Sequence, residues 1–124
     1  MKKSLPTNRL RVRARKTDPE DDARYRLSEL AEIDVADILD FTVDTWGPEQ
    51  ADRYLDHLVG CFDRIAHMPS LGRDCSAVHP GFRRIEEGRH VIFYRVEEFG
   101  IFIARVVHQK MLVTKEFLME RTFE

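Results

Sequence analysis

The last third of the chain is rich in side chains that can bind a phosphate group or move a proton beside it. These are Arg83, Arg84, Arg89, His90, Tyr94, Arg105, His108 and Lys110. Such a set can cleave RNA without a metal ion, because arginine stabilises the charge at phosphorus while histidine or tyrosine moves the 2′-hydroxyl proton. The alternative is structural: Arg95 and Arg105 pair with acids or lie along a sheet, and His108 only ends a strand. Residue type alone favours the structural alternative.

Other catalytic and metal-binding patterns in the sequence are weak. The glycines are scattered rather than gathered in a phosphate-binding loop, and no serine stands in a nucleophile-elbow context. His57 and Cys61 are four residues apart with His67 beyond them, but no second pair completes a zinc site. We therefore expect neither a metal nor a cofactor. A stripe of carboxylates without histidine or cysteine is interpreted as a solvated helix face. It consists of Asp37, Asp40 and Asp44.

The length and the cysteine content limit the class of protein. A chain of 124 residues fits one domain with a modest core. Two cysteines, Cys61 and Cys75, are too few for a disulfide framework and are expected as reduced thiols. No stretch is apolar for long enough to span a membrane, and the N-terminus lacks the apolar region of a secretory signal. We therefore expect a cytoplasmic protein without membrane contact.

Charge is distributed unevenly along the chain, although the formal net charge is only −2. Residues 29–64 hold ten acidic and two basic residues, whereas residues 81–115 hold seven basic and four acidic ones. The middle of the chain is therefore acidic and the part that follows is basic. A basic surface attracts an acidic partner or a phosphate backbone, and charge alone does not distinguish the two.

Residues 1–23 differ in composition from the rest. A basic run precedes an acidic one, and there is too little apolar surface to offset the entropy of ordering. We interpret this segment as a flexible charged extension, either a leader or the result of a start codon assigned too early, and expect the domain at 24–124. A basic arm that contacts nucleic acid is the functional alternative. The basic residues are Arg9, Arg11, Arg13, Arg15 and Lys16.

The next segment predicts a short strand followed by two helices. Residues 25–27 form the strand, and Ser28 is a typical N-cap of the first helix. Gly47 and Pro48 end this helix and begin a second one, which Pro69 and Gly72 end. The two helices should form an antiparallel hairpin. The predicted buried faces are Val35, Ile38, Leu39, Thr42 and Trp46 on the first helix, and Ala51, Tyr54, Leu55, Leu58, Phe62, Ile65 and Ala66 on the second.

Three short strands separated by glycine-containing turns follow, at 82–85, 90–96 and 101–108. The two longer strands are apolar on both faces and need cover on both, whereas the helical hairpin covers only one. After the third strand we expect a short helix or a frayed end. One side should hold Val91 and Phe93, the other Ile92, Tyr94 and Val96. In the last strand Ile101, Ile103 and Val107 should oppose Phe102, Ala104 and Val106.

Several motifs in this order resemble the ParE branch of the RelE/ParE toxin superfamily. The strand Tyr25-Arg26-Leu27 leads into an acidic helix, and WGPEQA (46–51) breaks it. The second helix ends in MPSLGR (68–73), and the strands GRHVIFYRV (88–96) and IARVVH (103–108) follow. Each motif is weak alone. All of them, in order and at matching spacing over about residues 25–111, make the resemblance strong.

This resemblance implies an α+β fold of order β-α-α-β-β-β, with a helical hairpin packed on a small antiparallel sheet. It implies the toxin of a type II toxin–antitoxin pair, which poisons DNA gyrase by binding rather than by catalysis. A ParD-like antitoxin would wrap and neutralise it in a hetero-oligomer. Such a partner could supply the missing cover of the sheet.

Two alternatives remain within the same fold. In RelE-type enzymes, which cut messenger RNA on the ribosome, an arginine commonly stands three residues before the tyrosine of the penultimate strand. Here Val91 stands there before Tyr94, which disfavours cleavage. If the protein is a ribonuclease, Arg89 and His108 are the expected catalytic residues. The second alternative is an inactive remnant that still binds antitoxin.

Charge and expected exposure suggest which residues meet a target or antitoxin. The polar candidates are Arg84, Arg89, Arg105, His108 and Lys110. The apolar candidates for a partner-covered sheet face are Ile92, Tyr94, Phe102 and Val106.

Overall fold

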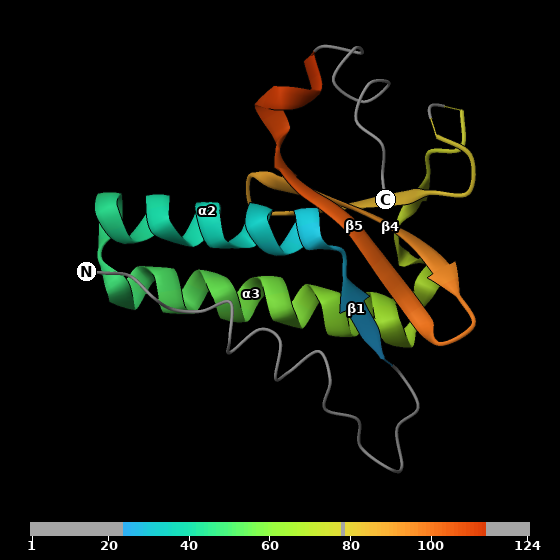
Figure 1. Ribbon diagram of the computed structural model, residues 1–124, viewed down its shortest axis with the longest axis horizontal. Helices are drawn as coiled ribbons and strands as arrows, with labels where there is room; N and C mark the ends of the chain where they lie inside the picture. The colour runs from blue at the N-terminus through green and yellow to red at the C-terminus, as the bar shows by residue number, and fades with distance from the viewer. Residues whose placement is uncertain (1–23, 78, 114–124) are drawn as a thin grey trace.

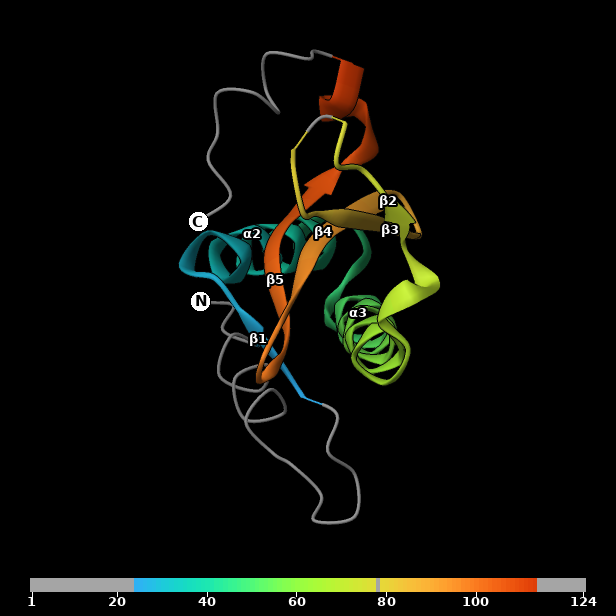
Figure 2. The same cartoon turned by 90° about the vertical axis from the view of Figure 1, so that its right-hand side faces the viewer.

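The computed structural model describes residues 24–77 and 79–113, and the predicted extension at 1–23 lies outside them. The predicted order of elements is confirmed (Figure 1), with one additional two-residue strand, β2, which is labelled in Figure 2. The elements are β1 (Tyr25–Leu27), α2 (Glu29–Trp46), α3 (Pro48–His67), the 3₁₀ helix η1 (Pro69–Leu71), β2 (Arg73–Asp74), β3 (Arg83–Glu87), β4 (His90–Glu97), β5 (Gly100–His108) and the 3₁₀ helix η2 (Gln109–Val113).

The strands form one sheet of order β1-β5-β4-β3-β2. The β5–β4 and β4–β3 pairs are antiparallel, as predicted, and β2 adds a further antiparallel pair with β3. In contrast, β1 lies parallel to β5 at the opposite edge (Figure 2). The first and last strands of the chain are therefore neighbours. The sequence predicted β1 but not this pairing, because a parallel partner can stand far away along the chain.

Ser28 joins β1 to α2 and fixes both. Its hydroxyl oxygen accepts a 2.9 Å hydrogen bond from the Ala31 N–H, as the predicted N-cap requires. The same hydroxyl donates to the Ala104 carbonyl at 2.7 Å, and the Ser28 N–H donates to the Ile103 carbonyl at 2.9 Å. The helix start is thus bonded directly to β5.

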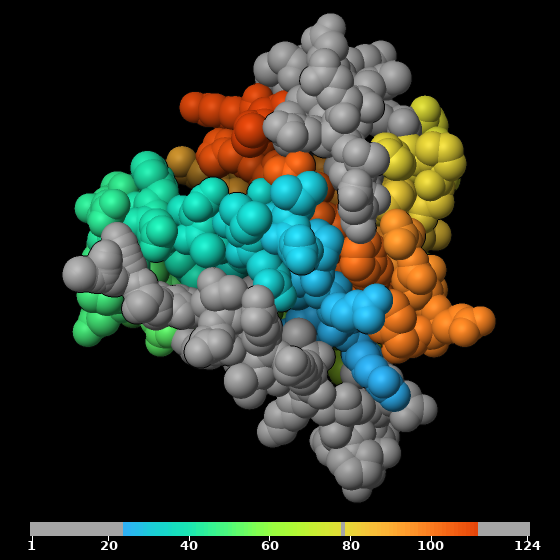
Figure 3. Space-filling view, in the orientation of Figure 1, coloured from blue at the N-terminus to red at the C-terminus, as the bar shows by residue number. Residues whose placement is uncertain are grey.

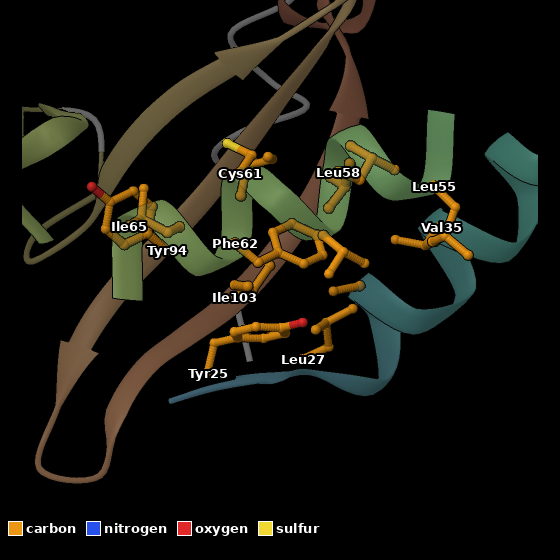
Figure 4. Packing of buried hydrophobic residues seen from close by; sticks show 14 of the residues in the cluster. Tyr25, Leu27, Val35, Leu55, Leu58, Cys61, Phe62, Ile65, Tyr94 and Ile103 are labelled. Carbon is orange, nitrogen blue, oxygen red and sulfur yellow. The ribbon is translucent and has the colours of Figure 1, made fainter. Parts of the chain in front are cut away.

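Both helices pack on one face of the sheet and bury the larger of two apolar clusters, here called the main core (Figure 4). The predicted face of α3 is confirmed, with Tyr54 and Ala66 at its half-buried margin. Trp46, predicted to be buried, is 69% exposed, because it is the last residue of α2 and the chain turns at Gly47. The main core is Tyr25, Leu27, Ala31, Val35, Leu39, Ala51, Leu55, Leu58, Val59, Cys61, Phe62, Ile65, Ile92, Tyr94, Ile101, Ile103 and Val106.

The opposite face of the sheet carries a second buried group, here called the outer cluster. It consists of Phe82, Val91, Phe93, Phe102, Ala104 and Val107. The predicted alternation is correct up to Ala104, where a bulge intervenes: Phe93 pairs with Arg105, but Tyr94 pairs with Ile103. One extra residue on β5 reverses the alternation after it. Val106 therefore lies in the main core and Val107 in the outer cluster, the reverse of the prediction.

In the part of the chain that the structure describes, neither long helix combines the length and apolar character needed to cross a membrane.

Candidate functional site

The predicted contact residues do not form one surface but lie in three places. Two are on the outer face and three are at one end of the sheet, while the rest are inside the protein. The outer-face residues are Arg84 and Phe102. Arg89, His108 and Lys110 lie at the end of the sheet. The internal residues are Ile92, Tyr94, Arg105 and Val106.

Arg105 is a structural residue rather than an exposed contact. Its side chain faces α2, where Nε donates to Asp34 Oδ2 at 2.8 Å and Nη2 donates to Oδ1 at 2.9 Å. Asp34 also accepts the Val106 N–H at 2.9 Å. Only 8% of Arg105 is exposed. The expectation of exposure fails because one carboxylate of the acidic helix holds this arginine in a two-pronged ion pair.

Tyr94 likewise serves the fold. Its hydroxyl donates to the Pro69 carbonyl at 2.6 Å and accepts from the Gly72 N–H at 2.8 Å, and burial raises its pKa. A Cβ atom at Gly72 would stand 2.4 Å from this hydroxyl oxygen, so the glycine permits the approach. Together with Ile92 and Val106, Tyr94 faces the helices and is not accessible to a partner in this structure.

The outer face alternates arginine and phenylalanine across neighbouring strands. Phe102 on β5 has Arg26 of β1 and Arg95 of β4 as its cross-strand partners. Their guanidinium carbons lie 6.0 and 4.5 Å from its ring centre, within the range of cation–π attraction. Arg95 also lies 5.5 Å from the ring centre of Phe82. We call Arg26, Phe102, Arg95 and Phe82 the arginine–phenylalanine row.

Two more contacts extend this pattern. Arg26 lies 4.3 Å from the ring centre of Phe99, where β1 meets the β4–β5 turn (blue beside orange in Figure 3). Arg84 lies 5.9 Å from the ring centre of Phe93. Arg26 was not among the predicted site residues. The alternation of Tyr25, Arg26 and Leu27 nevertheless puts its side chain on the sheet face away from the two core residues.

The end of the sheet where β4 begins and β5 ends gathers a polar group, here called the histidine end. His90 and His108 are cross-strand partners whose ring centres are 5.3 Å apart. The Tyr54 hydroxyl donates to the Glu87 carbonyl at 3.0 Å and lies 2.7 Å from His90 Nδ1. Because that hydroxyl has one proton, we assign a proton to Nδ1, which then donates to Tyr54. The Lys110 N–H donates to His108 Nδ1 at 3.1 Å.

Burial sets the protonation states of this group. It lowers the pKa of His90 to about 4, with His108 adding repulsion, so His90 is neutral at pH 7. Burial also raises the pKa of Tyr54 to about 12, assisted by Glu87, so the hydroxyl stays protonated. A base with such a low pKa is poorly matched to proton transfer near neutral pH. The exposed Arg89 and Lys110 beside it are suited to binding.

The cysteine, histidine and carboxylate patterns of the two helices do not form a site. Cys61 lies in the main core and burial raises its pKa to about 11, whereas His57 on the same helix is exposed. Over the ranges 24–77 and 79–113, no three histidine, cysteine or acidic side chains come together in a metal-binding group. The three carboxylates of the α2 stripe are exposed, as predicted.

Known proteins resemble this chain in sequence and in fold. Residues 25–113 match the family described as ParE toxin of type II toxin-antitoxin system, parDE. The chain is 43% identical over 94 residues to Toxin ParE1 of Mycobacterium tuberculosis (strain H37Rv), covering 75% of this chain and 96% of the relative. It is 40% identical over 87 residues to Toxin ParE1 of Caulobacter vibrioides, covering 70% and 90%.

A solved structure shares the fold. It is a chain of the chromosomal ParDE TA system from P. aeruginosa, with a TM-score of 0.59 and 23% sequence identity. The match covers 68% of this chain and 92% of that one.

Proposed function

This chain belongs to the ParE toxins of type II toxin–antitoxin systems, and from that premise we propose that it acts on DNA gyrase by binding, without a catalytic residue of its own. A ParD-like antitoxin in the same cytoplasm neutralises it in a hetero-oligomer.

The observation that carries this proposal is the bonding within the histidine end. Tyr54 and His90 are hydrogen-bonded to each other, and the low pKa of His90 makes it a weak base. Tyr94 is engaged by the loop after α3, and Arg105 is paired with Asp34. Of the side chains considered above for proton transfer, His90 and Tyr94 are thus bonded within the fold, whereas His108 stays at the end of the sheet beside the exposed cations.

These cations are the proposed contacts with gyrase. Arg89 lies in the β3–β4 turn and Lys110 in η2, and the Gln109 N–H joins the two segments by donating to the Arg89 carbonyl at 2.9 Å. This backbone bond holds both segments at one end of the sheet, next to His108. A fixed cluster of positive charge steers an acidic or phosphate-bearing target toward that end.

The outer face supports the antitoxin part of the proposal. Arg26 lies over the ring of Phe102 and Arg84 over the ring of Phe93, and no helix among the described residues of this chain covers this face. An extended acidic segment is complementary to such a face, because carboxylates can pair with arginine while apolar side chains meet the rings.

A supercoiling and cleavage assay with purified protein, gyrase, ATP and plasmid tests the target. We expect protein-linked cleaved DNA to accumulate and to disappear when the cognate antitoxin is added. Arg89→Glu and Lys110→Glu should each raise the protein concentration required by about tenfold, because each reverses a charge that meets the target.

Arg53→Glu is the matched control. Arg53 is exposed on α3 and donates to Gln50 Oε1 at 2.9 Å. If Arg53→Glu and Arg89→Glu lose the same potency against gyrase, the effect comes from the change in net charge, and the assigned contact surface is refuted. No effect of the unchanged protein on gyrase would refute the target.

Ribosome-dependent cleavage of messenger RNA is the second candidate, favoured by the pairing of His90 with His108. Against it, Val91 is fully buried in the outer cluster, where those enzymes commonly carry an arginine. New messenger RNA cuts that His108→Ala abolishes, with gyrase unaffected, would establish this candidate. Antitoxin binding without either activity would identify an inactive remnant.

A further inference from the structure

The two apolar clusters differ in what covers them. The main core lies beneath two helices, whereas the partly buried apolar side chains packed on the outer cluster are, within the described ranges, Cys75 and Phe99. Yet all six outer-cluster residues are at most 8% exposed. A sheet face of this composition is stable in water only when it is covered.

We propose that the chain's own C-terminal segment, residues 114–124, docks on the outer face and covers the arginine–phenylalanine row. This segment lies beyond the part that matches the toxin family, which ends at residue 113. The inference is independent of the target proposed above, and its test needs no gyrase.

The chemistry of the segment complements that of the face. It carries bulky apolar side chains, Phe117, Leu118 and Phe123, which suit a face of phenylalanine and valine. It also carries three acids against two bases, Lys115 and Arg121, and the acids can pair with Arg26 and Arg84, which lie over those rings, whereas Arg95 is already paired with Glu97. The acids are Glu116, Glu120 and Glu124.

The segment is also long enough. It follows η2, which follows β5 directly, and contains 11 residues. Eleven residues reach about 36 Å when extended and about 16 Å as a helix. The outer cluster runs along β5 from Phe102 to Val107, or about 17 Å. An extended segment can therefore turn back and follow the cluster along its whole length.

The covalent link favours this occupant over a free partner. A tethered segment acts at an effective concentration in the millimolar range for a short flexible connection. A separate protein that binds the same face must displace it, and thus binds more weakly than it would to the bare face.

Cys75 provides a reporter of this contact in the full chain, because it is half-buried and packs on the outer cluster. Cys61 is fully buried in the main core and reports global unfolding in the same sample. The rate of thiol modification is measured for both cysteines. In Glu116→Lys/Glu120→Lys/Glu124→Lys we expect Cys75 to react about tenfold faster and Cys61 to stay protected, because three attractions become repulsions.

The matched control reverses three exposed charges elsewhere, with Asp37→Lys/Asp40→Lys/Asp44→Lys on α2, and should leave the Cys75 rate unchanged. Adding Arg26→Glu and Arg84→Glu to the segment variant should restore protection of Cys75.

If the segment variant unfolds, Cys61 will also become reactive. The Cys75 rate is then measured in Phe117→Ser instead, with the same expectation. An unchanged Cys75 rate in the folded variant would overturn the proposal. Protection that grows with protein concentration would assign the face to a second copy and overturn it as well.

Discussion

The two faces of the sheet are both apolar, but they are built differently. The helix-covered face joins aliphatic side chains to Phe62, Tyr25 and Tyr94, and its fully buried members come from every long element. The outer face has aromatic rings beneath guanidinium groups. Burying a large apolar side chain contributes about 1.5–3 kcal/mol, whereas an exposed cation–π pair contributes about 0.5–1 kcal/mol. Because the outer cluster is buried as well, both faces stabilise the fold, and the outer face differs in carrying arginines that a partner can recognise.

The largest expected effect is a cavity in the main core. Phe62 is fully buried, and its ring centre is 5.3 Å from that of Tyr25 in an edge-to-face contact. Phe62→Ala should lower the free energy of unfolding by about 4 kcal/mol, measured by urea denaturation. The matched outer-face variant Phe99→Ala should cost about 1 kcal/mol, because that ring is only partly buried. Equal losses would remove the distinction between the faces.

The next effect concerns the ion pair that joins α2 to β5. Asp34→Asn leaves the buried Arg105 without its carboxylate partner and should cost about 3 kcal/mol of unfolding free energy. Asp37→Asn, three residues along the same helix but exposed, is the control and should change stability by less than about 0.5 kcal/mol. A small loss in Asp34→Asn would show that Arg105 finds another partner.

A third, smaller effect is the pH dependence that His90 contributes. Because its pKa is lowered to about 4 in the folded protein, the unfolded chain binds a proton first as the pH falls. Its contribution to stability is therefore complete above about pH 6.5 and is lost toward pH 4. Allowing for solvent screening, the loss should be about 1–2 kcal/mol. His90→Gln should lack this slope in urea titrations at several pH values, and an identical slope would contradict the assignment.

The smallest effect on stability is expected in the arginine–phenylalanine row. Arg26→Ala removes cation–π contacts with Phe99 and Phe102 and should cost about 0.5–1 kcal/mol. Antitoxin affinity, measured by calorimetry, should fall more than stability does. Arg53→Ala on α3 is the control for loss of a positive charge. If Arg26→Ala lowers stability but leaves antitoxin affinity unchanged, the arginine–phenylalanine row stabilises the fold and does not bind the partner.

Local patterns predicted much of this fold, and long-range contacts account for most of the errors. The Ser28 cap and the buried face of α3 follow from neighbouring residues, so the sequence sufficed for both. The bulge at Ala104 carries no glycine or proline signal, and a single extra residue exchanged the environments of Val106 and Val107.

The candidate site was less predictable for the same reason. The bond between Asp34 and Arg105 spans 71 positions, and the contact between Tyr54 and His90 spans 36. Residue type and spacing identified Arg89 and His108 as members of the histidine end. They did not identify Tyr54, which joins this group to α3. Without these partners, neither the burial of Arg105 nor the low pKa of His90 follows from the sequence.

The parallel pairing of β1 with β5 has a consequence for how the protein is made. Ser28 bonds to Ala104, 76 positions later, so the sheet cannot close until nearly the whole domain has been synthesised. Contacts of such high contact order form late and slow folding. At translation rates of about 5–20 residues per second, this leaves several seconds in which the helical hairpin exists without its complete sheet. The toxin fold is therefore assembled only at the end of its own translation.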